Sequence, residues 1–150
     1  MLRQILSAEE DLLKVESGKG GVGKTVLVVD DYAPIRKMLA TAFLSDGFKT
    51  CGEAADGKEA IELAKRMKPD VVTLDFSMPG LSGLRVASAL RKVFPKLPII
   101  LFTLYANTNL EIEAANVGIN LVLLKTVPLS TLIDKAHELM ADSRAREKTG

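Results

Sequence analysis

Five polar residues, far apart in the chain, each end or directly follow a short apolar run that is typical of a β-strand. They are Asp30, Asp31, Asp75, Thr103 and Lys125. In an open parallel sheet the carboxyl ends of the strands meet at one edge, which is where such sheets bind ligands. We therefore expect the five side chains to lie together. Three carboxylates in one place repel one another unless a cation joins them, so the group predicts a metal site.

The strand-like runs alternate with segments of helical periodicity from about residue 25 to residue 140. The runs are residues 26–29, 71–74, 99–102 and 121–124, with a weaker one at 49–54. Each is followed by apolar residues at helical spacing, and the ends of the first four helices are marked by Gly47, Pro69, Pro95 and Gly118. This alternation predicts an α/β fold, a doubly wound five-stranded parallel sheet with helices on both faces.

The composition fits one globular domain and argues against several classes of function. Of 150 residues, 47% are hydrophobic and 26% are charged, which is enough for a sizeable core. A net charge of +1 gives no electrostatic reason to expect direct binding to nucleic acid. The single Cys51 cannot form an internal disulfide, and no run reaches the ~20 apolar residues of a membrane helix. We expect a cytoplasmic protein that does not enter a membrane.

The residues at the predicted sheet edge resemble the motifs of the response-regulator receiver domain of two-component signalling. The resemblance covers about residues 25–142, and its motifs are the Asp30-Asp31 pair, Asp75 followed by Met78-Pro79 and Gly83, Thr103, and Lys125. One motif alone would be weak evidence, but the full set at family-like spacings is specific. The resemblance implies a flavodoxin-like (βα)5 receiver fold and a single-domain switch that is controlled by phosphorylation. Such a domain assists its own phosphorylation and dephosphorylation without being an enzyme for another substrate.

The resemblance also implies a role for each residue of the group. Asp75 would be the phosphoacceptor, whose carboxylate attacks the phosphoryl group of a phosphohistidine or a small phosphodonor. Lys125 would pair with Asp75 or with the phosphoryl oxygens, and the Thr103 hydroxyl would hydrogen-bond the phosphoryl group, so that both sense it. The ligands implied for Mg²⁺ are Asp31 and Asp75 directly, Asp30 through water, and the backbone carbonyl of Ser77.

Two positions near this predicted site depart from the family pattern. Val122 stands three residues before Lys125, where many receivers have a Tyr or Phe that reorients on activation. Leu104 follows Thr103 where a small residue is common. The nearest aromatic residue along the chain from Thr103 is Tyr105, which is therefore the candidate switch residue. Its ring could point to the surface or across the helix predicted at 108–117.

A competing motif lies before the first strand-like run. Residues 18–25, Gly-Lys-Gly-Gly-Val-Gly-Lys-Thr, satisfy the P-loop pattern and would suggest an ATPase fragment. A working P-loop needs a strand before it and a helix after it, so that a helix N-terminus faces the phosphates. Here a strand-like run follows the motif, and a charged segment precedes it. A Gly-rich linker is the better interpretation.

The chain therefore divides into an N-terminal extension and linker at 1–24, a receiver domain at 25–142 and a polar tail at 143–150. Within the extension, the apolar residues at helical spacing are Leu2, Ile5, Leu6, Leu12 and Leu13. This segment could dock on a partner or on its own receiver, or it could be a frayed tail.

The expected partners are a sensor histidine kinase or a phosphotransfer protein upstream and an unknown target protein downstream, and a homodimer is also open. Besides the P-loop ATPase fragment, a receiver-like interaction module that works without phosphorylation is an alternative function.

Overall fold

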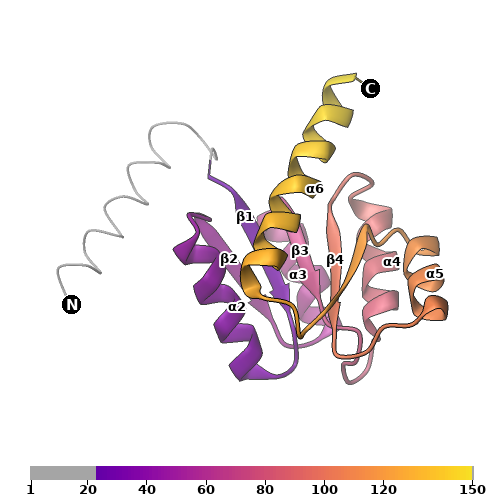
Figure 1. The fold of residues 1–150 in the computed structure, drawn as a ribbon. Helices are drawn as coiled ribbons and strands as arrows, with labels where there is room; N and C mark the ends of the chain where they lie inside the picture. The colour runs from indigo at the N-terminus through magenta and orange to yellow at the C-terminus, as the bar shows by residue number, and fades with distance from the viewer. Residues whose placement is uncertain (1–22, 150) are drawn as a thin grey trace, which may run out of the picture.

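The computed structural model describes residues 23–149, and over this range five strands and five helices alternate as predicted (Figure 1). The strands are β1 (Thr25–Val29), β2 (Thr50–Ala54), β3 (Val71–Leu74), β4 (Ile99–Thr103) and β5 (Leu121–Leu124). The helices are α2 (Ala33–Ser45), α3 (Gly57–Met67), α4 (Gly83–Val93), α5 (Thr108–Asn116) and α6 (Leu129–Thr149).

All strands lie in one parallel sheet with the order β2-β1-β3-β4-β5. The predicted doubly wound α/β fold is confirmed. Because every strand is followed by a crossover helix, all carboxyl ends lie at one edge, which we call the carboxyl edge. The opposite edge, where the strands begin, is the amino edge. Gly23 and Lys24, the first described residues, lead into β1 at the amino edge.

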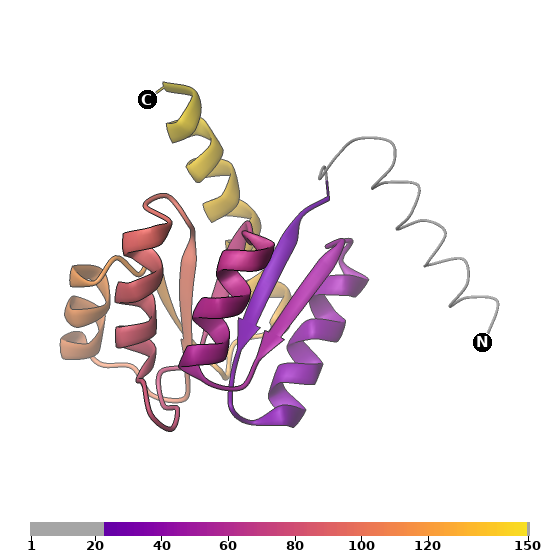
Figure 2. The ribbon, with the colours of Figure 1, turned by 180° about the vertical axis from the view of Figure 1, so that it is seen from behind.

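Helices cover both faces of the sheet, and the period-2 alternation of the strands divides the core between them (Figures 1 and 2). In β1, Val26 and Val28 pack with α2 and α6, whereas Leu27 and Val29 pack with α3, α4 and α5. Burial on both faces explains why β1, β3 and β4 appear in the sequence as continuous apolar runs.

The ends of the helices follow the local sequence. Pro34 lies in the first turn of α2, and Gly47, just after its end, has a φ of 109° that favours glycine. The side chain of Asn107 caps α5 by accepting a hydrogen bond from the Leu110 amide at 2.8 Å. Gly118, with a φ of 95°, follows the end of α5, as predicted.

The last helix is longer than its apolar residues indicated. We predicted a polar tail at 143–150, but α6 continues to Thr149. Its last buried apolar residue is Met140. The following residues are mostly good helix formers with no proline or glycine before position 150, so the helix continues without a buried stripe. It projects past the amino edge of the sheet (Figure 1).

Two sets of hydrogen bonds connect chain segments at the amino edge. The backbone N–H and the hydroxyl of Thr25 both donate to Asp70 Oδ2, at 2.8 and 3.2 Å. His137 of α6 donates from Nε2 to Asp46 Oδ2 at 2.7 Å and accepts at Nδ1 from Lys24 Nζ at 3.1 Å. His137 therefore joins α6 to the end of α2 and to the start of β1.

Candidate functional site

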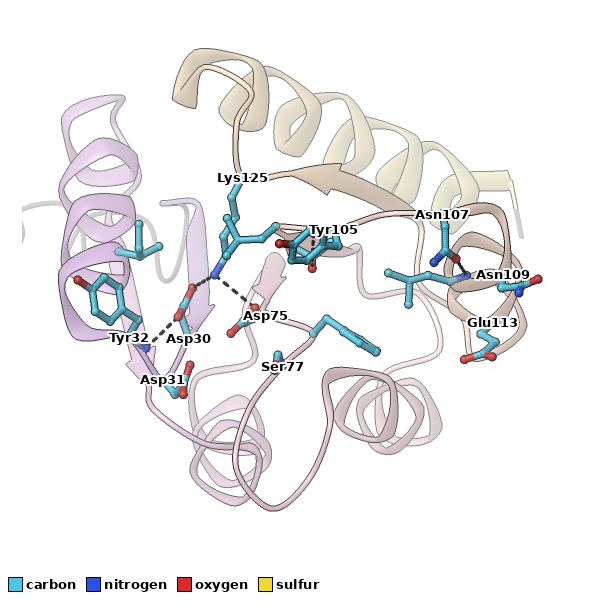
Figure 3. Close-up of a pocket in the computed structure, with 15 residues that line it drawn as sticks. Asp30, Asp31, Tyr32, Asp75, Ser77, Tyr105, Asn107, Asn109, Glu113 and Lys125 are labelled. Carbon is cyan, nitrogen blue, oxygen red and sulfur yellow. Dashed lines mark hydrogen bonds and ion pairs between the residues drawn. The ribbon is translucent and has the colours of Figure 1, made fainter.

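The carboxyl edge brings together all five residues singled out in the sequence. Asp30 and Asp31 follow β1, Asp75 follows β3, Thr103 ends β4 and Lys125 follows β5. Because β1, β3, β4 and β5 are successive neighbours in the parallel sheet, their carboxyl ends converge. These residues line one pocket of about 860 Å³, with Ser77 on its wall (Figure 3).

Three carboxylates meet in this pocket. Asp30, Asp31 and Asp75 each offer an oxygen, and these oxygens lie within 4.8 Å of one another. Asp30 is 2% exposed and Asp75 is 7% exposed, whereas Asp31 is open to solvent. Burying like charges together is unfavourable, so the arrangement favours a bound cation. Oxygen atoms from carboxylates are also the ligands that Mg²⁺ takes in proteins.

Lys125 supplies one positive charge to this group. Its Nζ lies 2.8 Å from Asp30 Oδ2 and 3.3 Å from Asp75 Oδ1 (Figure 3). The resemblance implied a pairing with Asp75, and the structure adds a shorter contact with Asp30. One ammonium does not balance three carboxylates, so the pocket keeps an excess of negative charge.

The pKa values of Asp75 and Lys125 reflect this crowding. Burial raises the pKa of Asp75 above its ordinary value, and repulsion from Asp30 raises it further. Attraction to Lys125 and a backbone hydrogen bond from Ser77 act in the opposite direction without cancelling these effects. Burial by itself would lower the pKa of Lys125, but its contacts with Asp30 and Asp75 outweigh burial and raise it. Lys125 is therefore held as an ammonium beside the acids.

The position of Asp30 depends on contacts that the sequence did not reveal. Arg36 of α2 donates to the backbone carbonyl of Asp30 at 2.8 Å and pairs with Glu53 of β2 at 3.3 Å. The Asp30 amide donates to the Ala54 carbonyl, and Asp30 Oδ1 accepts from the Tyr32 amide at 2.9 Å. The only signal in the sequence was a basic residue in the second turn of a helix that follows two acids.

The loop after Asp75 is held close to the sheet by Gly83. The Gly83 amide donates to the Phe76 carbonyl at 2.9 Å. A Cβ atom at Gly83 would lie 2.9 Å from Phe76 Cα and closer still to the Asp75 carbonyl oxygen. Any larger residue would push the loop, and with it Ser77, away from Asp75.

Thr103, at the end of β4, and Tyr105, in the loop that follows, also line the pocket. Thr103 is buried, and its hydroxyl accepts a hydrogen bond from the Tyr105 amide at 3.4 Å. The side chains that follow are open, since Leu104 is 63% exposed and Tyr105 is 82% exposed. The sequence left two orientations for the Tyr105 ring, at the surface or across α5, and in the structure the ring lies at the surface. Val122 packs against the apolar core beneath α5.

The described residues of the P-loop-like segment, 23–25, do not line this pocket. Residues 18–22 of the motif lie outside the described part of the chain. Lys24 and Thr25 lie at the amino edge and lead into β1. Because a strand follows Thr25, no helix N-terminus is placed there to bind phosphates.

The architecture and the acidic pocket define a protein of the receiver class, and comparison with known proteins identifies the family. The sequence model of the response regulator receiver domain matches residues 26–137, so this chain belongs to that family. Receiver domains are signalling domains of two-component response regulators that act as phosphorylation-based switches, and they bind Mg²⁺ at an acidic pocket. They interact with histidine kinases or phosphotransfer proteins and with downstream targets.

Two relatives illustrate the range of this family. Chemotaxis protein CheY of Thermotoga maritima is 33% identical over 118 residues, which cover 79% of this chain and 98% of that protein. Transcriptional regulatory protein PdtaR of Mycobacterium tuberculosis is 37% identical over 130 residues. That match covers 85% of this chain but 61% of PdtaR.

Solved structures agree with the fold. Chemotaxis protein CheY4 of Vibrio cholerae superposes with a TM-score of 0.75 at 28% identity, covering 79% of this chain and 99% of that one. CheY in the CheX-CheY-BeF3-Mg²⁺ complex of Borrelia burgdorferi gives a TM-score of 0.74 at 26% identity, covering 79% of this chain and 90% of that one.

Among the helices of residues 23–149, none combines the length and apolar character needed to cross a membrane.

Proposed function

We propose that this chain accepts a phosphoryl group on Asp75, with the help of Mg²⁺, and passes the signal to a partner protein in the cytoplasm. The observation that carries the proposal is the group of three carboxylates with oxygens within 4.8 Å of one another and with Lys125 in contact with two of them. The phosphoryl donor would be a sensor histidine kinase, a phosphotransfer protein or a small phosphodonor.

The contacts of Asp30 support an unequal division of the metal ligands. Its Oδ2 accepts from Lys125 and its Oδ1 accepts from the Tyr32 amide, so both oxygens already have a donor, which disfavours a direct metal bond relative to Asp31 and Asp75. Asp31 is exposed and Asp75 faces the pocket. We therefore assign Asp31, Asp75 and the Ser77 carbonyl as direct ligands and Asp30 as a ligand through water. When bound, Mg²⁺ would neutralise the carboxylates and the phosphoryl oxygens.

In the proposed reaction, a carboxylate oxygen of Asp75 attacks the phosphorus of the donor in line with the bond that breaks. With a phosphohistidine donor, the phosphorus–nitrogen bond breaks and the imidazole leaves with the bonding electrons. Lys125 would hold the phosphoryl oxygens by charge. The Thr103 hydroxyl would exchange its hydrogen bond from the Tyr105 amide for one to a phosphoryl oxygen.

We propose that the signal leaves through the segment 103–109. Movement of Thr103 toward the phosphoryl group would break the bond that now joins it to the Tyr105 amide, so the loop before α5 would reorder. The ring of Tyr105, now at the surface, would change its packing and alter the surface that a target protein or a second copy contacts. This mechanism needs no aromatic ring at Val122.

The test of this function is intact-mass analysis after incubation with acetyl phosphate and Mg²⁺. The parent chain should gain one phosphoryl mass, and the gain should be lost when EDTA replaces Mg²⁺. Asp75→Asn should gain nothing. Asp134→Asn, which alters an exposed acid on α6, is the matched control and should behave like the parent.

A receiver-like module that works without phosphorylation is the alternative, and no contact in the structure favours it. It would be supported if the parent chain bound Mg²⁺ but gained no phosphoryl mass from any donor.

A further inference from the structure

An apolar groove lies at the amino edge of the sheet, away from the acidic pocket. It has a volume of about 410 Å³ and runs between α6 and the segment that joins α4 to β4. Leu97, Pro98 and Met140 form its buried base. Val93 and Pro95 are exposed on its wall, and Val93 has 47% of its surface open. An exposed valine beside a buried apolar base favours an apolar occupant.

The rim of this groove is basic. Lys96 and Arg144 line it and are exposed. Arg91, at the end of α4, donates hydrogen bonds to four groups. They are the carbonyls of Gly118, Phe94 and Pro95 and the side chain of Asn120. These four partners are uncharged groups.

Other charged residues near the rim also favour an acidic occupant. Burial lowers the pKa of Arg91, and repulsion from Arg146 on α6 lowers it further, which shows that positive charges gather here. Asp70, the acid that lines the groove, is already bonded to Thr25. The groove therefore suits a segment that combines apolar side chains with acids.

The chain itself supplies such a segment next to the groove. Thr25, the first residue of β1, is bonded to Asp70 on the groove wall, so the chain preceding β1 starts at this edge. Residues 1–17 carry five apolar side chains at helical spacing, interrupted by Glu9, together with four acids and two bases. The acids are Glu9, Glu10, Asp11 and Glu16, and the bases are Arg3 and Lys14. The glycine-rich residues 18–23 can span up to roughly 20 Å when extended. A short linker gives a tethered segment a high effective concentration, so modest contacts suffice.

We propose that residues 1–17 dock in cis in the groove between α6 and the α4–β4 segment, with their leucine and isoleucine side chains against Val93 and Met140. On a helical projection Glu9 lies among these apolar side chains and Glu10 lies beside them. These two acids would then face Lys96 and Arg144. This contact joins the N-terminal extension to the end of the receiver domain opposite the phosphoacceptor site, and it does not depend on the proposed phosphorylation.

Paramagnetic relaxation in the full chain tests the proposal. Ser7 lies opposite the apolar residues on a helical projection, so a nitroxide on Ser7→Cys would not occupy the contact. The native thiol is a poor competitor for the label, because burial raises the pKa of Cys51 to about 12. We expect strong broadening of the amide signals of Val93, Lys96 and Arg144 and none around Gly80, in the loop at the opposite edge.

Matched variants show whether the groove is responsible. Val93→Glu should abolish the broadening, whereas Leu44→Glu should keep it, since Leu44 is 48% exposed at the end of α2 and does not line the groove. Lys96→Glu should reduce the broadening. The cis proposal is overturned if Val93 and Lys96 show no broadening, or if Leu44→Glu removes it as fully as Val93→Glu. It is also overturned if labelled chains broaden the signals of separate, unlabelled chains to the same extent, since the occupant is then a second copy.

Discussion

The two edges of the sheet both hold acids near lysines, but they balance charge differently. At the amino edge each acid has its own donors, since Asp70 is bonded to Thr25 and Asp46 to His137, beside Lys24. At the carboxyl edge Lys125 contacts Asp30 and Asp75, and the carboxylate of Asp31 lies beside theirs, so one ammonium faces three acids. A fully matched group stabilises the fold, whereas a group with excess charge needs something from outside the chain. This difference separates structural polar residues from those of a binding site.

Replacing a lysine at each edge should give the largest contrast. Lys125→Ala leaves Asp30 and Asp75 buried without a cation, and we expect it to lower the free energy of unfolding in EDTA by about 3–5 kcal/mol. Lys24→Ala removes a partly exposed contact and should cost no more than about 1 kcal/mol. Phosphorylation should be impaired by the first change and kept by the second. Urea unfolding curves measure both effects, and equal losses of stability would show that the two edges do not differ in this way.

The affinity for Mg²⁺ should depend on which acid is removed. Asp31→Ala should weaken binding tenfold or more, about 1.4 kcal/mol, because it deletes a proposed direct ligand. Asp30→Ala should weaken it less, since the oxygens of Asp30 are engaged by Lys125 and the Tyr32 amide. Asp46→Ala, at the amino edge, is the control and should leave affinity unchanged. Calorimetric titration decides, and equal affinities in all three variants would reject the metal site.

Removing the charge of Asp75 should stabilise the metal-free protein. Burial and Asp30 raise the pKa of Asp75 above 3.8, so the folded state binds a proton more tightly than the unfolded state does. Stability is then lost as pH rises from 3.8 through the raised pKa. In EDTA at neutral pH, Asp75→Asn should unfold at a higher urea concentration than the parent and should lack this loss of stability.

The control for this gain is Asp56→Asn, because an asparagine can still cap α3. Its stability should equal that of the parent at each pH. A loss of stability in Asp75→Asn in EDTA would mean that the carboxylates do not strain the site.

The smallest expected effect concerns Tyr105. Beryllofluoride with Mg²⁺ should shift backbone signals around Asp75, Lys125 and residues 103–109, and Tyr105→Ala should reduce the shifts that reach α5. Tyr32→Ala is a fair control, since Tyr32 is also an exposed aromatic residue at the pocket. If Tyr105→Ala keeps every shift beyond its immediate neighbours, the ring does not transmit the signal.

The sequence was sufficient to predict the fold and the meeting of the five site residues. The strands β1, β3 and β4 are buried on both faces and so appear as apolar runs. Parallel connection then brings Asp30, Asp75 and Lys125 to one edge. These inferences need only local patterns and the rule that strand ends converge.

Other features depend on register and length, which local patterns do not encode. The contact of Arg36 with Glu53 requires β2 to pair with β1 so that Glu53 lies opposite Val28. Lys125 lies beside two acids and makes its shorter contact with Asp30, because the surrounding backbone places that carboxylate nearer to it. Helix α6 extends beyond Met140, and the sequence there has no stripe of apolar residues from which the extension could be predicted.

The central claim is that Asp75 carries the phosphoryl group, and chemical mapping in the parent chain tests it most directly. Borohydride converts an aspartyl phosphate to homoserine, which peptide mass spectrometry locates. After treatment with acetyl phosphate and Mg²⁺, we predict homoserine at position 75 and at no other aspartate. Homoserine at Asp30 or Asp31, or phosphate that resists borohydride on a serine or threonine, would contradict the account.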